Sequence, residues 1–497
     1  MRQVEPQDAT FLYIEGRNRH SHGTLAWIYD PAGGPRGGLR HADLLRHVEQ
    51  RLHVASLLHQ KLVRVPLDLD YPYWIEDESF DITHHVREAP LAEPGDWASL
   101  FRTLAEVHSA PMALDRPLWE IHLVRGLDVP ELPKGAFALL LKLHHVALDG
   151  AAAMALLQGL HDTEPQAATA RLDADERDAP QAARAVVPAG SAGDAVTGAQ
   201  PRPARPPAGA AMLRATAVNN LQYSLRGAQA LARMAGRLPE LLSSVRLRSL
   251  FSGAAVPETL FNQPVSPERS IGVLFVELDE IKALRRLVPG ATVNDVLLAI
   301  CGGALRRYLA ARDALPGESM ITVCPMNLRT AEESGATAGN RISVLSTPLH
   351  TDVADPVERL AAIHRTTGRA KHTMDAIGRR EVLELGNSLP SALQALAIKA
   401  IDALPDSVKL PRMFNLSISN LPGPAEPLYL GGARLHRIAG GMPVGDGYGL
   451  FVTICTCNGQ LAFTVTSARN ILPDPQELMD EFRASYEEYL EAARVRA

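Results

Sequence analysis

Cysteine is scarce in this chain of 497 residues, and no long apolar run is present. The four cysteines are too few for a disulfide framework and lack the spacing of zinc ligands, so we expect reduced thiols. They are Cys301, Cys324, Cys455 and Cys457. No segment approaches the roughly 18 uninterrupted apolar residues of a transmembrane helix, and residues 1–6 form no apolar signal core. We expect a cytoplasmic protein that is soluble or at most sits on a membrane surface.

A surplus of basic residues is also missing. The chain has 50 Lys and Arg against 56 Asp and Glu, which gives a net charge of −6. A nucleic-acid binder needs excess positive charge to neutralise phosphates, so the composition argues against that class. The hydrophobic fraction of 46% and the charged fraction of 21% are ordinary for a soluble globular protein. A chain of this length is long for a single hydrophobic core and suits two domains.

Aromatic residues are absent from residues 162–211, which are rich in Ala, Pro, Gly, Asp and Arg. Such a segment buries too little apolar surface to offset the entropy of ordering it. We therefore predict a flexible linker over residues 162–211, between an N-terminal domain over 1–161 and a C-terminal domain over 212–497. Strand and helix patterns alternate on both sides of it, which indicates an α/β or α+β fold.

Apolar spacing predicts the individual elements. Strands are expected at residues 23–29, 118–124, 137–143, 271–278, 320–325, 415–419, 449–457 and 461–466. Helices are expected at residues 39–52, 97–109, 151–160, 292–309, 356–371, 381–403 with a break at Pro390, and 475–494. Residues 212–250 are helical in pattern and basic, with six Arg against one Glu. Two interpretations of this region stay open: a helix that docks on anionic lipid headgroups, or an ordinary solvated helix face.

The most informative segment is the apolar run at residues 139–143, which ends in His144 and His145 and is followed by Asp149 and Gly150. Adjacent side chains on a strand point to opposite faces, so the two histidines cannot both enter one pocket. A neutral imidazole suits the removal of a proton from an alcohol near pH 7, which predicts a general base at this strand end. The alternative is a buried histidine pair with Asp149 capping the next helix. A metal site is disfavoured, because no third ligand is evident nearby.

Further motifs accompany the histidines in a defined order. They are Pro117-Leu118-Trp119, Asn294-Asp295, Asn327-Leu328-Arg329 with Gly339-Asn340, and Ser419-Asn420-Leu421-Pro422-Gly423-Pro424. Together with the histidine motif, they resemble the bacterial wax ester synthase/diacylglycerol acyltransferase family, one of the CoA-dependent acyltransferases that share an HHxxxDG motif. The resemblance spans nearly the whole chain, from residues 8–12 to 420–424. The sequence departs from the family pattern in its long 162–211 insert and in Met326, where a smaller residue is expected.

The resemblance implies two similar chloramphenicol-acetyltransferase-like domains with the active site in a tunnel between them. It assigns His145 as the general base and His144 as its structural neighbour. Asn294 would line the reaction centre, whereas Asp295 would support the helix start; both residues are alternatively only a helix cap. The remaining implied positions are structural or substrate-binding. They are Asp149 in a salt bridge with Arg329, Gly150 leaving space for a ligand, Pro117, Leu118 and Trp119 as architectural residues, and Ser419 or Asn420 as hydrogen-bond donors to the thioester oxyanion or to CoA, unless they form only a turn.

The function that the resemblance implies is acyl transfer from acyl-CoA to a fatty alcohol, to diacylglycerol, or to both. Acyl-CoA is then a co-substrate, and no metal or prosthetic group is expected. A peripheral contact with a membrane or lipid droplet fits such substrates. Two alternatives stay open: a condensation-type acyltransferase that uses carrier-protein thioesters, and a catalytically silent lipid-binding or droplet-associated protein.

Overall fold

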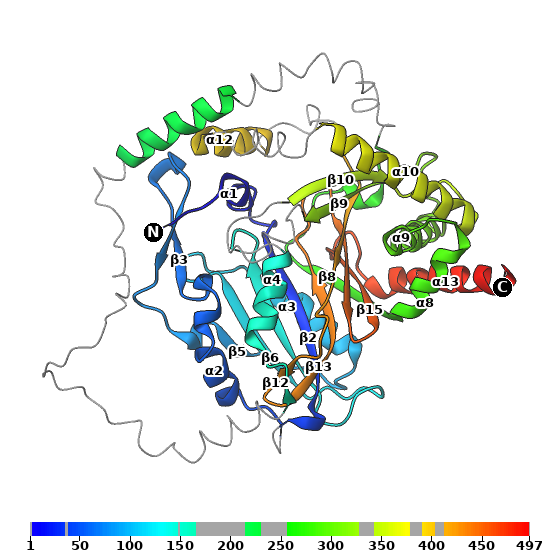
Figure 1. Ribbon diagram of the computed structural model, residues 1–497, viewed down its shortest axis with the longest axis horizontal. Coiled ribbons are helices and arrows are strands. Elements are labelled where there is room, and N and C mark those ends of the chain that lie inside the picture. The colour runs from blue at the N-terminus through cyan, green and yellow to red at the C-terminus, as the bar shows by residue number, and fades with distance from the viewer. Residues whose placement is uncertain are drawn as a thin grey trace, which may run out of the picture.

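Two six-stranded sheets with flanking helices form the framework of the protein in the computed structural model (Figure 1). The structure describes residues 2–34, 38–147, 150–165, 214–229, 256–327, 342–377, 390–402 and 412–496. Most of the predicted linker, residues 166–211, therefore lies outside the described residues. The mixture of sheets and helices confirms the expected α/β class. Among the helices that the structure describes, none has the length and hydrophobicity needed to cross a bilayer.

The first sheet carries the histidine motif and has the strand order β12-β13-β2-β7-β6-β5. Its strands are β2 (His22–Asp30), β5 (Val86–Glu88), β6 (Trp119–Arg125), β7 (Phe137–His144), β12 (Tyr429–Leu430) and β13 (Ala433–Gly441). Helices α2 (His41–Glu49) and α4 (Gly150–Leu160) cover one face, and α3 (Trp97–Ser109) covers the other. Every residue of β7 is buried, because this central strand has helices on both faces. That burial explains its nearly continuous apolar sequence.

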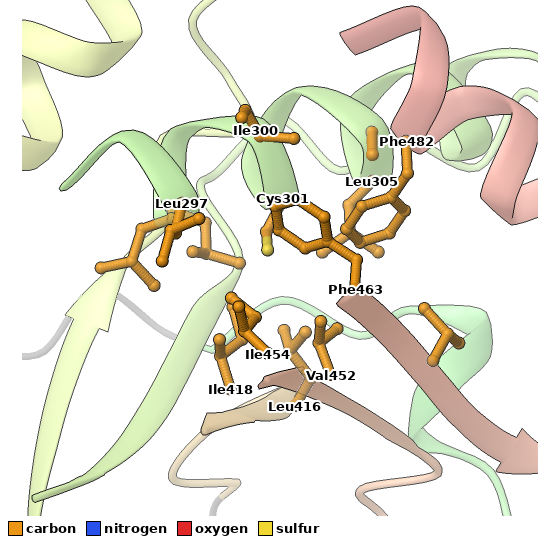
Figure 2. Close-up of a cluster of buried hydrophobic side chains, with 14 of the residues drawn as sticks. Leu297, Ile300, Cys301, Leu305, Leu416, Ile418, Val452, Ile454, Phe463 and Phe482 are labelled. Atoms are coloured by element: carbon orange, nitrogen blue, oxygen red, sulfur yellow. The ribbon is translucent and has the colours of Figure 1, made fainter. Parts of the chain in front are cut away.

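The second sheet has the order β10-β9-β11-β14-β15-β8. Its strands are β8 (Arg269–Glu277), β9 (Ile321–Asn327), β10 (Ile342–Pro348), β11 (Leu416–Leu421), β14 (Leu450–Cys457) and β15 (Gln460–Ala468), and its helices are α8 (Leu278–Leu284), α9 (Val293–Ala310), α10 (Pro356–Ile377) and α13 (Pro475–Arg496). Figure 2 shows that α9 covers this core, with Leu297, Cys301 and Leu305 pointing toward side chains of β11 and β14. All four cysteines are buried free thiols.

A smaller layer lies beside the end of the first sheet. It consists of β1 (Arg2–Gln3), α1 (Pro6–Tyr13), β3 (Gln60–Val63), β4 (Tyr73–Glu76), the helix over residues 214–229 and α12 (Ser391–Asp402). Its apolar cluster includes Leu118 and Val146, which flank the histidine motif in space. The layer therefore packs directly against the end of β7.

Strand β13 joins the two halves of the chain. It pairs antiparallel with β2 in the first sheet, although it follows β11 of the second sheet in sequence. The amides of Gly440 and Met442 donate to the hydroxyls of Thr464 and Thr466 on β15, at 3.3 and 3.2 Å. One strand thus holds both sheets in a fixed relation.

The predicted domain division needs correction at two points. Residues 429–441 belong to the first sheet, so the chain beyond residue 212 does not form a separate unit. Asp162, the expected first linker residue, is anchored: it pairs with Tyr429 through two backbone hydrogen bonds, and its carboxylate lies 2.8 Å from Arg51. The backbone hydrogen bonds and the ion pair with Arg51 hold Asp162 in place. The composition of the residues that follow Asp162 gave no sign of these contacts.

Gly423 follows β11 and lies close to β14, so a substitution at this position tests how closely the two segments approach. Its amide donates to the Thr456 hydroxyl of β14 at 2.9 Å, and a Cβ at this position would lie only 1.6 Å from the Thr456 carbonyl oxygen. We expect Gly423→Ala to lower the free energy of unfolding by about 1–3 kcal/mol, because the backbone must shift to relieve the overlap. Urea denaturation measures the change.

The matched control is Gly368→Ala in α10, where no described atom lies within 4 Å of the added Cβ. This substitution is expected to leave stability unchanged or to raise it by about 0.5–1 kcal/mol, because alanine favours the helix. Equal effects of the two substitutions would contradict the close approach at Gly423.

Candidate active site

His144 is the last residue of β7 and is completely buried. Its Nδ1 accepts a hydrogen bond from the Val146 amide at 3.1 Å, so the ring proton belongs on Nε2. Nε2 lies 3.2 Å from a carboxylate oxygen of Glu15. His144 therefore links the turn after β7 to the segment that follows α1.

His145 comes directly after β7 and has different neighbours. Its amide donates to the carbonyl oxygen of Ser21 at 2.8 Å. Its half-buried ring stacks on Phe11 of α1, with centroids 5.0 Å apart and the planes 22° from parallel. The backbone hydrogen bond positions the His145 main chain, and the stacking contact positions its ring.

Glu15 is the site residue that the sequence analysis missed. It also accepts a hydrogen bond from the Ser21 amide at 2.9 Å, so one carboxylate contacts both the end of β7 and the residue before β2. Burial alone would raise the pKa of Glu15, but the contact with His144 and the Ser21 amide lower it below its ordinary value. No short-range sequence pattern marks Glu15, because its partners lie 6 and 129 residues away.

The Pro117-Leu118-Trp119 segment supports the same turn from the neighbouring strand. The Leu118 carbonyl accepts from the His144 amide at 3.2 Å. The Trp119 indole donates to the Leu58 carbonyl at 2.9 Å and stacks on His85, with centroids 4.5 Å apart. All three residues of the segment are buried. These contacts anchor the segment in the protein interior.

A buried polar layer lies on the His144 side of β7. The ammonium of Lys142 donates to the carbonyls of Val107 and Ala110, at the C-terminal end of α3. Burial lowers the pKa of Lys142 to about 8. His22 pairs with His144 across the strands, and its Nε2 donates a hydrogen bond to the His108 carbonyl oxygen at 2.7 Å. Burial lowers the pKa values of His22 and His108 well below the ordinary value, so both are neutral at pH 7.

The Asn294-Asp295 pair lies in the first turn of α9. Asp295 forms a capping box with Thr292 and also accepts from His364 at 2.9 Å and from Thr367 at 2.8 Å. Burial would raise the pKa of Asp295, but these hydrogen bonds bring it below its ordinary value. Asp295 therefore holds α9 to α10. Asn294 is half-buried beside it.

The Ser419-Asn420 pair lies in strand β11 rather than in a turn. Both residues pair with β14 in parallel register, opposite Thr453 and Ile454. Ser419 is half-buried and Asn420 is exposed. The turn interpretation is therefore wrong for these two residues, because strand pairing continues through Leu421 before the following prolines end it.

Two predicted positions cannot be placed. Asp149 and Arg329 lie outside the described residues, so their salt bridge stays a prediction. Gly150 is the first residue of α4.

Comparisons with known proteins agree on one family. The wax ester synthase/diacylglycerol acyltransferase catalytic domain matches residues 4–297, and the C-terminal domain of the same family matches residues 338–489. The chain belongs to the wax ester synthase/diacylglycerol acyltransferase family. It is therefore an acyltransferase, as the motifs predicted.

Individual relatives cover the entire chain. The probable diacylglycerol O-acyltransferase tgs2 of Mycobacterium tuberculosis is 31% identical over 511 residues, with 99% of each protein covered. The solved wax ester synthase/diacylglycerol acyltransferase of Marinobacter aquaeolei VT8 is 25% identical, with a TM-score of 0.67, and the match covers 99% of this chain and 100% of that one. The first condensation domain of the CDA synthetase shares the fold, with a TM-score of 0.55 at 15% identity, covering 99% of this chain and 96% of that one.

Glu15 can be tested by replacing its carboxylate. We expect Glu15→Gln to lower kcat on the order of tenfold with little change in KM, because His144 loses a charged partner while the substrate surfaces remain. A second readout is the pH dependence of unfolding. The stabilisation by Glu15 is fully present above the ordinary carboxyl pKa of 4.5 and is lost as the pH falls through the lower folded-state pKa.

The control is Glu78→Gln, at an exposed glutamate whose loss should change neither kcat nor the pH dependence. A Glu15→Gln enzyme with unaltered kcat and an unaltered stability profile would show that Glu15 does not position the histidine motif.

Proposed function

We propose that this acyltransferase moves an acyl chain from acyl-CoA to the hydroxyl of a long-chain fatty alcohol or diacylglycerol, with His145 as the general base. The observation that carries the proposal is the separation of the histidine pair. His144 is buried against Glu15, whereas His145 is half-buried and held by Ser21 and Phe11. Of the two histidines, only His145 is partly exposed.

The proposed reaction proceeds without a covalent enzyme intermediate. His145 takes the hydroxyl proton of the acceptor as the oxygen attacks the thioester carbonyl carbon. The new C–O bond forms, the C–S bond breaks, and the departing CoA thiolate receives the proton from His145. The products are an ester and free CoA, so no metal, redox cofactor or water is consumed.

Residues from the second half of the chain would complete the site. We assign Asn294 to the lining of the reaction centre, and Ser419 or Asn420 to a hydrogen bond with the thioester oxyanion or with CoA. Asp149 and Arg329 would brace the turn as an ion pair. The relatives' names support diacylglycerol as an acceptor, and a solved condensation domain in complex with C8-CoA supports a CoA substrate in this fold.

The acceptors that we propose partition into lipid, so the enzyme would act at a lipid surface in the cytoplasm. A condensation-type reaction with a carrier protein is less well supported, because the condensation domains share only the fold at 13–15% identity. A catalytically silent lipid-binding protein would keep the fold but release no thiol.

The general base can be tested with purified protein, palmitoyl-CoA, and hexadecanol or dipalmitoylglycerol. Free thiol release is expected for the wild type, and His145→Ala should lower the rate on the order of 10²–10⁴-fold, because the acceptor proton loses its base. The matched control is the exposed His53, whose replacement by alanine should leave the rate unchanged. A His145→Ala rate equal to that of the wild type would overturn the assignment. Absence of thiol release from the wild type with either acceptor would favour the silent protein.

A further inference from the structure

The helix over residues 214–229 packs its polar side against the rest of the protein. Thr216, Asn219 and Tyr223 face inward, and the Asn219 amide donates to Asp70 at 2.8 Å and to the Tyr73 hydroxyl at 3.1 Å. The opposite side is apolar and exposed, as in a helix that lies on a lipid surface. It presents Val218, Leu221 and Leu225, which are 48%, 62% and 55% exposed.

Helix α12 has the same inverted arrangement. Its inward residues Ser391 and Gln394 bond to α1: Ser391 shares a hydrogen bond with the Tyr13 hydroxyl at 2.5 Å, and Gln394 donates to the Thr10 hydroxyl at 2.7 Å. Leu393 and Leu396 point outward and are 52% and 64% exposed. Two separate helices thus bury polar side chains and expose leucine, the reverse of an ordinary surface helix.

The two helices form one surface with the turn at Pro66–Asp68. Tyr71 contacts both, through a hydrogen bond to Gln394 at 2.9 Å and an edge-on ring contact with Tyr223. Figure 1 shows both helices at the same end of the molecule, beside β3 and α1. The turn adds Leu67, which is 87% exposed, and Leu69, whose carbonyl accepts from Asn220 at 2.8 Å.

This apolar face concentrates the exposed hydrophobic side chains of the described structure. Of the nine large hydrophobic residues that are exposed in the described ranges, six lie on these three elements and a seventh, Leu69, directly follows the turn. Such clustering marks an interaction surface, whereas single exposed leucines are normal. The seven are Leu67, Leu69, Val218, Leu221, Leu225, Leu393 and Leu396.

The charges on and around this face fit a negatively charged lipid surface. The helix over 214–229 contains Arg214 and Arg226 and no acidic residue, and Lys399 lies on α12. Asp68 of the turn is largely covered and pairs with Arg64 at 2.8 Å and with Lys399 at 3.5 Å, so the arginines of the helix supply the remaining positive charge. Leucines bordered by the arginines of a helix without acidic residues match a phospholipid monolayer with anionic headgroups.

We propose that the apolar face formed by residues 214–229, α12 and the turn at Pro66–Asp68 docks the enzyme on an anionic phospholipid surface. Helix α12 of this face is hydrogen-bonded to α1, and Phe11 of α1 stacks on His145. Docking therefore places α1 between the lipid and the candidate base. This inference rests on the proposed function for its purpose, since a lipid-soluble acceptor would enter from that surface. The surface itself follows from the exposed leucines.

The test uses the full chain and the triple substitution Leu221→Gln, Leu225→Gln and Leu396→Gln. Flotation with phosphatidylcholine vesicles, with and without phosphatidylglycerol, measures binding. The wild type is expected to float, more strongly with phosphatidylglycerol and less at high salt. The triple variant should bind ~100-fold more weakly, because three leucines no longer leave water. Its urea midpoint should not change, since the replaced side chains are exposed.

The matched control substitutes the two exposed hydrophobic residues outside this face, Met413→Gln and Val495→Gln, and should float like the wild type. His145→Ala should also float normally, so loss of catalysis and loss of docking are separate results. The triple variant should keep activity on short, water-soluble substrates and lose it on vesicle-embedded diacylglycerol.

Equal flotation of the wild type and the triple variant would overturn the proposal. Wild-type protein that does not float, but forms a dimer that the triple variant abolishes, would also overturn it and assign the face to a second copy of the chain.

Discussion

The pairing of β13 with β2 is the interaction on which the rest of the structure depends. Strand β2 lies between β13 and β7, so the ladder that holds β13 also borders the strand with the histidines. Through Thr464 and Thr466, β13 is bonded to β15 of the second sheet as well. Because strand ladders fix register, α9 and β11 cannot slide relative to His145 without breaking this pairing. The site that we propose draws on both halves of the chain and needs such a constraint.

The neighbouring residues His144 and His145 differ in burial, and this difference favours different roles for them. The His144 side of β7 faces a layer of polar groups, including Lys142 and His108, whose hydrogen bonds all go to other protein atoms. Burying a lysine is costly unless its ammonium is bonded, and here it closes the last turn of α3. The bonds of Lys142 tie the end of β7 to α3. The ring of His145, just beyond that layer, stacks on Phe11 of helix α1.

The sequence predicted the elements whose patterns are strong. Strand β7 and helix α9 begin and end within a residue of the expected positions, because one is continuously apolar and the other has a capping box. Strand β13 was missed, since a bulge between Leu435 and Arg437 breaks its alternation and it ends in two glycines. Glu15 could not be predicted because its role depends on a contact across 129 residues. The family motifs located His144, His145 and Trp119, whereas spatial partners required the fold.

The helix over 214–229 shows why composition alone left two interpretations open. Its arginines are compatible with a solvated face or a lipid surface, and the decision depends on which side packs against the protein. Asn219 and Tyr223 satisfy buried polar groups around Asp70, so the helix is oriented by hydrogen bonds rather than by apolar burial. Leu221 and Leu225 are then forced outward. The same logic holds for α12, where Gln394 bonds to α1. The hydrogen bonds that anchor these two helices therefore also determine that their leucines are exposed. Helix α1 connects the two helices to His145, because Phe11 of α1 stacks on the His145 ring.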